Sequence, residues 1–280
     1  MEELYKNFLV TQLLQQNMFF PSKGWMVGFS YRGASTLLTR IFLRHLDMEK
    51  LALEKKLWIS DYRDQVLRPQ WGQMLHDGQL MHFLKSPEVL RIKFVRNPFI
   101  RLVSAFVHCF RFEARPDRRR QNPVRADWLG PLSDQMLNIS FRQFVFFLAQ
   151  KGVQPGKCNP HYSHQKMLFE GSIVDYRHVF PVEKLSKAFA VLSEIDPQMP
   201  TLNEGFDAKE KSYHKTKHDR GRGTCVADLP FTKLIVLQDG KEIFPPYRFF
   251  YDAQLKRMVA NLYHVDFETY GYSKSIIPLN

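Results

Sequence analysis

The sequence predicts an α/β fold in which a mainly parallel central sheet is flanked by helices. Two short apolar runs, Trp25–Phe29 and Leu90–Val95, are typical of buried strands. Each run is followed by a turn and then by apolar residues at helical spacing, over residues 35–46 and 98–112. A strand, a turn and a helix in repeated succession is the pattern of α/β folds, because each helix covers the sheet beside it.

The other elements follow from the same periodicities. Residues 1–22 are expected to form a helix, and residues 47–88 are expected to be mostly helical. Ser140 is a typical N-cap residue and stands before a run of apolar residues at helical spacing. A short strand over 179–182 and a helix over 183–195 follow.

The last helices are expected over residues 246–263. No stretch has the composition of an interdomain linker, so the sequence predicts one domain over residues 1–280, with 1–22 as an N-terminal helical extension. The segments expected to be loops are 111–125, 151–165 and 200–226.

Composition and charge exclude several classes of protein. The chain has 280 residues, 44% of them hydrophobic, which excludes a disordered or collagen-like chain. No apolar run reaches the ~18 residues of a transmembrane helix. Lys+Arg 40 against Asp+Glu 28 leaves a net charge of +12, which favours an anionic partner. Nucleic acid, anionic glycan, nucleotide and membrane surface all meet that description.

The cysteines and the N-terminus indicate the compartment. Cys109, Cys158 and Cys225 are odd in number and widely spaced, which argues against a disulfide framework and against a paired-cysteine metal site. The N-terminus lacks the basic start and the small-residue cleavage site of a signal peptide. The sequence therefore predicts a cytoplasmic protein.

A glycine-containing loop follows the first strand. Residues 28–35, which begin with Gly28 and end with Gly33, Ala34 and Ser35, fit a phosphate-binding loop in which Ala34 replaces the usual lysine. Backbone N–H groups and the N-terminus of the next helix still favour an anion there. Arg32 could supply the missing charge, and Ser35 adds a hydroxyl group. The alternative is a plain strand–turn–helix connection with no ligand.

A second basic element follows the second strand. Arg96 stands just past its end, and Ser104 lies on the next predicted helix. Open α/β sheets bind ligands at the carboxyl ends of their strands, so a guanidinium and a hydroxyl group in these places can converge on one anion. The alternative is a surface ion pair at Arg96 and a solvent-facing Ser104.

Together these elements resemble sulfotransferases that use 3′-phosphoadenosine 5′-phosphosulfate (PAPS), and the carbohydrate sulfotransferase branch is the most similar. Residues 96–106 match the 3′-phosphate motif of that family, R-D/N-P-F/Y-x-R-L-x-S-x-F/Y, almost throughout. Residues 30–38 resemble its first loop, with Ala34 in place of a glycine. Residues 158–165 resemble D/N-x-H-W/Y-x-x-Q, residues 179–185 resemble F-x-x-E-x-L, and residues 265–272 resemble the family's closing segment.

The resemblance implies a sulfotransferase fold similar to that of P-loop nucleotide kinases, and roles for particular residues. His161 would be the general base, because histidine accepts protons near neutral pH. Arg32 would stabilise the leaving nucleotide; in the alternative alignment of the loop, shifted by one residue, Tyr31 takes that place. His164 is the alternative base, and together with Gln165 it would contact the acceptor. The residues expected to bind PAPS are Tyr31, Arg32, Gly33, Ala34, Ser35, Thr36, Arg96, Ser104, Arg220 and Gly221.

The expected acceptor is a hydroxyl group of a carbohydrate or glycolipid. The resemblance implies no metal and no nucleic-acid partner, and without a leader or anchor it points to a bacterial cytoplasmic enzyme. Two alternatives differ in class. The absent lysine argues against a nucleotide kinase. A non-enzymatic or inactive protein that binds polyanions or glycans on the same fold is favoured by the net charge of +12.

Overall fold

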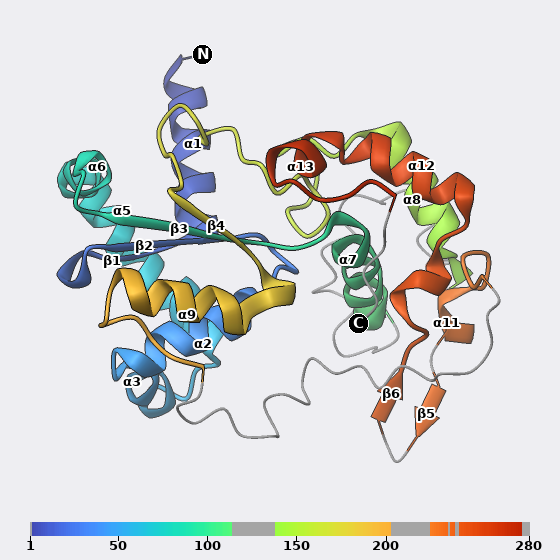
Figure 1. The fold of residues 1–280 in the computed structure, drawn as a ribbon, viewed down its shortest axis with the longest axis horizontal. Coiled ribbons are helices and arrows are strands. Elements are labelled where there is room, and N and C mark those ends of the chain that lie inside the picture. Colours follow the sequence, from blue (N-terminus) through green and yellow to red (C-terminus); the bar gives the residue numbers. More distant parts are fainter. Residues whose placement is uncertain (1, 114–137, 203–224, 235, 239–240, 276–280) are drawn as a thin grey trace. The chain divides into compact units, whose positions relative to one another are not determined.

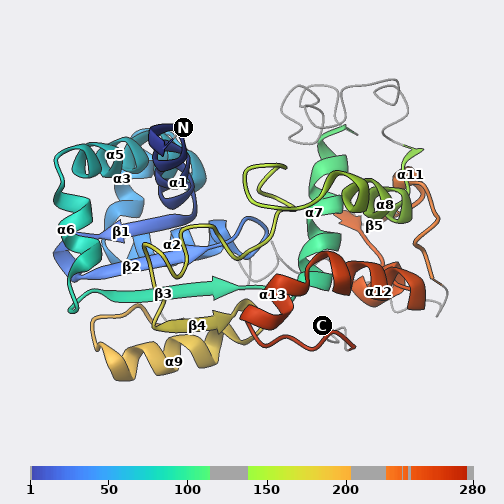
Figure 2. The same cartoon turned by 90° about the horizontal axis from the view of Figure 1, so that it is seen from above.

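A computed structural model describes residues 2–113, 138–202, 225–234, 236–238 and 241–275 of the chain (Figures 1 and 2). By internal contacts the chain divides into two compact units. The first comprises Met1–Arg96 and Gln165–Glu204, and the second comprises Asn97–His164 and Gly205–Asn280. The single domain expected from the sequence stays a prediction.

The first unit is built on a four-stranded sheet with the strand order β1-β2-β3-β4. Strands β2, β3 and β4 run parallel, and β1 pairs with β2 in the antiparallel direction. The strands are β1 (Asn17–Phe20), β2 (Trp25–Phe29), β3 (Leu90–Val95) and β4 (His178–Pro181). The predicted α/β class with a mainly parallel sheet is therefore confirmed.

Helices cover both faces of this sheet, as Figure 1 shows. On one face, Phe42 of α2 (Ser35–His45) and Phe189 of α9 (Leu185–Ile195) lie 6.1 Å apart between ring centroids, and Phe189 stacks on Phe94 of β3. On the other face, Phe19 of β1 contacts Trp71 and Phe83 edge-on. The helices of this second face are α1 (Glu2–Gln16), α5 (Arg68–His76) and α6 (Gln79–Lys85).

The expectation of mostly helical structure over 47–88 is also confirmed. Short helices connect α2 to α5, and a π-helical turn joins the last of them to α5. Single 3-10 turns follow β1 and β4. These elements are α3 (Met48–Glu54), α4 (Ile59–Tyr62), the π turn η2 (Arg63–Leu67), and the 3-10 turns η1 (Pro21–Lys23) and η5 (Val182–Lys184).

The predicted helix over 1–22 is wrong in its last turn. The helix ends at Gln16, and Asn17–Phe20 forms strand β1 at the edge of the sheet. All four residues of the strand are buried. A strand alternates its side chains between two faces and can bury every residue when both faces are covered, whereas a helix at an edge buries one side.

The second unit is mainly helical and has its own aromatic core. Phe106 of α7 (Pro98–Glu113) lies near the centre of that core and contacts Phe144 of α8 (Phe141–Lys151) and Phe231. The predicted cap at Ser140 is confirmed, because its side chain accepts a hydrogen bond from the Gln143 backbone amide. The Gln143 side chain in turn accepts one from the Ser140 backbone amide. The other helices are α11 (Phe231–Leu234), α12 (Ala253–Leu262) and α13 (His264–Thr269).

The C-terminal part differs from the helices expected over 246–263. A 3-10 turn, η6 (Tyr247–Phe250), precedes α12, because Asp252 caps the Leu255 amide and starts the helix at the next residue. The antiparallel pair β5 (Val236–Gln238) and β6 (Lys241–Ile243) has no counterpart among the predicted elements. Among the described residues, no helix combines the length and the apolar character needed to cross a bilayer.

Candidate functional site

In the first unit, the candidate anion site is the loop that joins β2 to α2. Arg32 and Ala34 adopt left-handed backbone conformations, with φ of 63° and 61°. Alternating left-handed residues turn successive N–H groups toward one side, which makes a concave anion site. Ala34 is the N-cap of α2 and has no polar side-chain atom, so it offers no cap to the amides of the first turn. Those amides and the positive end of the helix dipole favour an anion.

The loop requires a glycine at position 33. The Gly33 amide donates to the Ser30 carbonyl at 2.8 Å. A Cβ at this position would lie 2.6 Å from Ser30 Oγ and 2.9 Å from Ser30 O. Gly28, the first glycine of the loop pattern, is required for a different reason. It lies inside β2, where a Cβ would come within 2.7 Å of the Tyr176 ring. The pattern therefore combines one packing glycine with one loop glycine.

Arg96 follows β3 and reaches the same loop, because β2 and β3 are parallel neighbours. Its Nη1 donates to the Arg32 carbonyl at 3.0 Å. The half-buried guanidinium of Arg96 therefore lies beside the left-handed turn, and both belong to the first unit. A cation and a row of amide donors at one sheet edge is the arrangement that binds phosphate or sulfate groups.

Gln165 joins the ends of the two strands. Its Oε1 accepts hydrogen bonds from Ser30 Oγ at 2.9 Å and from the Arg96 amide at 2.8 Å. Its Nε2 donates to the Arg96 carbonyl at 2.7 Å. The side chain is fully buried, and these bonds go to the loop and to Arg96. Gln165 was expected to contact the acceptor, whereas the structure gives its amide protein partners.

In the second unit, one face of α7 holds the segment that contains His161. Arg101, Ser104 and His108 are spaced i, i+3 and i+7, so they share a face of the helix. Arg101 is buried and donates from Nη1 to the Ser163 carbonyl at 2.6 Å and from Nη2 to the Pro160 carbonyl at 3.0 Å. The helix face therefore fixes the backbone on both sides of His161.

Further contacts hold the same segment. Tyr263 donates from its hydroxyl group to the Tyr162 carbonyl at 2.5 Å, and the His164 amide donates to the Val153 carbonyl at 2.8 Å.

Burial lowers the pKa of Arg101, and the nearby Asp266 carboxylate opposes that shift. An arginine keeps its charge under such a shift, because its ordinary pKa is far above neutral pH.

The hydrogen bonds of His161 define its tautomer. Asn159 Oδ1 lies 3.0 Å from the His161 backbone amide and 2.7 Å from its ring Nδ1. An amide N–H can only donate, so the Asn159 atom is an oxygen and Nδ1 carries the ring proton. When the imidazole is neutral, Nε2 is then its acceptor nitrogen. The ring stacks on His108, with 4.9 Å between the centroids.

His164, the alternative base, has the opposite arrangement. Its Nε2 lies 2.9 Å from the Leu262 carbonyl. A carbonyl oxygen only accepts, so Nε2 carries the proton, and the buried ring is tied to the end of α12. Of the two histidines, His161 is thus the one whose Nε2 can accept a proton.

Not all predicted site residues can be compared with the structure. Tyr31, Ser35 and Thr36 lie in the loop and in the first turn of α2, together with Arg32, Gly33 and Ala34. Ser104 belongs to the second unit and Arg96 to the first, so their action on one phosphate group stays a prediction of the motif. Arg220 and Gly221 lie outside the described residues.

Sequence reasoning assigned no role to three residues that the structure places around His161. Asn159 opens the motif in which His161 was found, so its spacing of two residues was a usable signal. Arg101 is part of the 3′-phosphate motif, but its burial and its carbonyl partners come from the fold. His108 had only its position one helical turn after Ser104 as a signal. Within the described ranges, no group of three His, Cys, Asp or Glu side chains could hold a metal ion.

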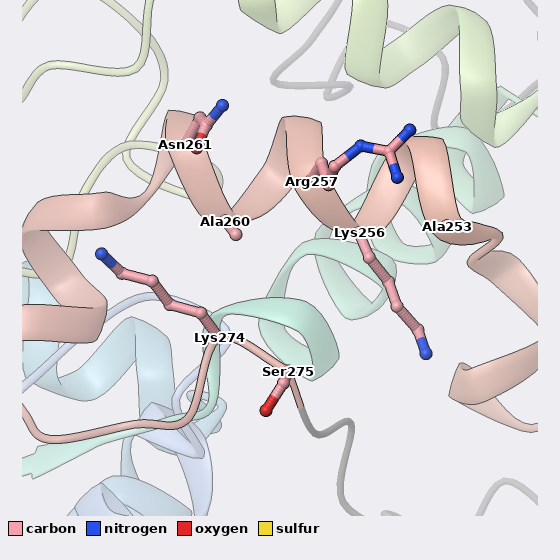
Figure 3. Close-up of a pocket in the computed structure, with 7 residues that line it drawn as sticks. All are labelled: Ala253, Lys256, Arg257, Ala260, Asn261, Lys274 and Ser275. Atoms are coloured by element: carbon pink, nitrogen blue, oxygen red, sulfur yellow. The ribbon is translucent and has the colours of Figure 1, made fainter.

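The second unit also has an open basic hollow of about 490 Å³ beside α12 (Figure 3). Lys256 and Arg257 extend from the helix, and Lys274 extends from the segment that follows α13. Lys274 also binds Glu268 at 2.8 Å. No residue predicted to bind PAPS or the acceptor lines this hollow. Its lining residues are Ala253, Lys256, Arg257, Ala260, Asn261, Lys274 and Ser275.

Comparison with known proteins identifies the family of the chain. A profile described as the sulfotransferase family matches residues 33–273, which is most of the chain. The match includes the Arg96 motif and the segment that contains His161. No curated protein and no solved structure gives a significant match. The resemblance seen in the motifs is therefore confirmed at the level of the family: this chain belongs to the sulfotransferase family, whose members are transferases.

Proposed function

We propose that this protein transfers a sulfuryl group from PAPS to a hydroxyl group of a carbohydrate or glycolipid. The observation that carries the proposal is the left-handed turn at Arg32 and Ala34 with the Arg96 guanidinium bound to it. That arrangement offers amide donors and positive charge to a phosphosulfate or phosphate group. It needs no lysine in the loop, which explains how Ala34 is tolerated.

The residues present fit the nucleotide. Residues 31–36 would hold the 5′-phosphosulfate through backbone amides, hydroxyl groups and the Arg32 charge. Arg96 would bind the 3′-phosphate, and the motif assigns Ser104 to the same group. PAPS supplies an activated sulfuryl group whose bond to the 5′-phosphate breaks as the acceptor oxygen bonds to sulfur. The loop would stabilise the negative charge that develops on the departing phosphate.

His161 would take the acceptor proton. Because its Nδ1 proton is bound to Asn159, the Nε2 lone pair is the basic site of the ring. The proton would pass from the acceptor hydroxyl group to Nε2 as the bond to sulfur forms. His164 would instead support α12, and Gln165 would keep the loop and Arg96 in register. A general base contributes about 10²- to 10⁴-fold to the rate, so His161 is expected to affect kcat strongly.

The experiment that tests this function is an acceptor screen with PAPS. The protein is incubated with PAPS and a panel of neutral, carboxylated and sulfated glycans, and release of 3′-phosphoadenosine 5′-phosphate (PAP) is measured. We expect acceptor-dependent release in the wild type and loss of that release in His161→Ala. Turnover that stays at the wild-type rate in His161→Ala would contradict the assigned base.

A second candidate function is polyanion binding without catalysis, and the basic hollow beside α12 favours it (Figure 3). The side chains of Lys256 and Arg257 have neither a hydrogen-bond nor an ion-pair partner among the described residues, so their charge is available to an anion. This function predicts glycan binding that weakens steeply with salt and is unaffected by PAP. If the protein is instead a sulfotransferase that binds an acidic acceptor in the hollow, Lys256→Ala is expected to raise the KM for that acceptor.

A further inference from the structure

We infer that Lys93 is a positioning residue for the nucleotide site, although it lies inside the sheet and away from the loop. The inference rests on the proposed function. Lys93 occupies the middle of β3 and is 2% exposed. A strand covered on both faces normally carries apolar side chains at such a place. A buried ammonium group there is costly unless its hydrogen bonds are satisfied.

The charge of Lys93 is matched by Glu170. The ammonium group forms an ion pair with Glu170 Oε1, and both side chains are buried. The same Oε1 accepts a hydrogen bond from the Met167 amide at 2.7 Å. Lys93 also lies 5.3 Å from the centroid of the Tyr176 ring. The ion pair is therefore held from several sides and has little freedom to turn away.

A third contact connects this ion pair to the loop through Gln165. Lys93 Nζ donates to the Gln165 backbone carbonyl at 2.7 Å. The side chain of Gln165 in turn bonds Ser30 Oγ and both backbone polar groups of Arg96. The carbonyl bond fixes the backbone from which that side chain projects. Loss of the bond would let the amide shift and would loosen the loop and Arg96 together.

Gly28 makes room for this arrangement. Asn17, Gly28 and Lys93 are paired across β1, β2 and β3 in one register row. Tyr176 lies over Gly28 and donates from its hydroxyl group to Asn17 Oδ1 at 2.5 Å. The row is thus a polar layer beneath the strand ends that carry the loop. The inference predicts that this layer acts on nucleotide affinity and on loop order, and less on proton transfer.

Two variants separate positioning from folding. Lys93→Met removes the donor and leaves Glu170 buried without its partner, which destabilises the fold. The double variant Lys93→Met with Glu170→Gln removes both charges, so it is expected to regain thermal stability. It still lacks the donor to the Gln165 carbonyl. Arg91→Met is the matched control, because Arg91 is a buried cation on the same strand that bonds the Leu84 and Ser86 carbonyls instead.

The measurements are amide hydrogen exchange of the peptide covering 29–37, calorimetric titration with PAP, and melting temperature. In the double variant we expect faster exchange in that peptide and a rise in the Kd for PAP of about tenfold, as the loss of one charged hydrogen bond implies. We expect Arg91→Met to lower the melting temperature and to leave exchange and Kd within about twofold of wild type, because it has no link to Gln165.

The outcomes are distinguishable. Wild-type exchange and Kd in a double variant that binds PAP would overturn the inference. Equal effects in Arg91→Met would also overturn it, because they would show a general loss of stability. If the wild type fails to bind PAP while only the Lys93 variants show faster exchange, the proposed function is contradicted and the positioning role is supported.

Discussion

Asn159 and His161 share two hydrogen bonds through one oxygen atom. Asn159 Oδ1 accepts from the His161 backbone amide at 3.0 Å and from its ring Nδ1 at 2.7 Å. The first bond fixes the orientation of the amide group, and the second fixes the tautomer of the ring. Asn159 is therefore the residue that leaves Nε2 as the proton acceptor.

The first prediction concerns Asn159→Asp. A carboxylate beside Nδ1 favours the protonated imidazole, so a higher pH is needed before Nε2 can act as a base. The acid limb of the kcat/KM profile is expected to move upward by about one to two pH units. Asn159→Ala, which lacks the acceptor, is expected to lower kcat by about tenfold with no such upward shift. Identical pH profiles in Asn159→Asp and wild type would contradict the tautomer assignment.

The second prediction separates the two histidines. His161→Ala is expected to reduce kcat by about 10²- to 10⁴-fold while PAP affinity stays near the wild-type value. His164→Ala removes a buried ring bonded to the Leu262 carbonyl and is expected to lower the unfolding free energy by about 1–3 kcal/mol. Kinetics and urea unfolding on the same two variants provide the measurement. A larger kcat loss in His164→Ala would identify it as the base.

The third prediction concerns the left-handed residue Ala34. A side chain at φ of 61° costs about 1–2 kcal/mol, and glycine avoids that cost. Ala34→Gly is therefore expected to stabilise the protein by up to about 1 kcal/mol after the greater entropy of the unfolded glycine chain is included. Ala149→Gly, at an exposed position of α8, is the control and should destabilise by about 1 kcal/mol. Urea unfolding that shows the same loss in both variants would rule out the left-handed strain.

The fourth prediction concerns Gly33. A Cβ there would lie 2.9 Å from the Ser30 carbonyl oxygen, which cannot move without the backbone. Gly33→Ala is expected to distort the loop and to weaken PAP binding by more than about tenfold, as the displacement of loop amides from the anion implies. Gly72→Ala is the control, since its Cβ would have only Leu14 Cδ1 at 3.9 Å in reach. PAP affinity should remain unchanged in Gly72→Ala. Calorimetric titration of both variants with PAP provides the measurement, and wild-type affinity in Gly33→Ala would contradict the prediction.

The fifth prediction concerns stability against acid. Hydrogen bonds from Arg142 lower the pKa of Asp228, and bonds from the Leu255 amide and Arg142 lower the pKa of Asp252. A carboxylate with a lowered pKa stabilises the fold above its ordinary pKa of about 4, and the contribution is lost as the pH falls through the folded value. Arg142→Met should therefore lower the melting temperature at pH 7 and have a smaller effect at pH 3. An equal effect at both values would show that the ion pairs contribute little.

Local patterns accounted for much of the fold. The strands Trp25–Phe29 and Leu90–Val95 were predicted with the observed bounds, because each is a short buried run that ends in a turn. Strand β1 was missed because Asn17–Phe20 continues the helix expected over residues 1–22, and only pairing with β2 distinguishes the two conformations. The pair β5 and β6 was missed for the same reason, because its pairing is not visible in a three-residue run.

The site was predictable where its residues are close in sequence. The loop at 30–36 and His161 belong to short motifs, and such motifs are visible without a fold. Gln165 and Arg96 are 69 positions apart, and Lys93 and Glu170 are 77 positions apart, so their roles depend on strand packing. Gln165 was placed at the acceptor by its motif, and a motif does not show that the amide bonds Ser30 and Arg96.

The central claim is that the loop and Arg96 bind the nucleotide of PAPS. The most direct test is calorimetric titration of the wild type and Arg96→Ala with PAP. We expect micromolar-range binding by the wild type and its loss in Arg96→Ala, with similar melting temperatures for the two proteins. A wild type that binds neither PAP nor ATP would contradict a nucleotide site at this loop and would favour the polyanion-binding function.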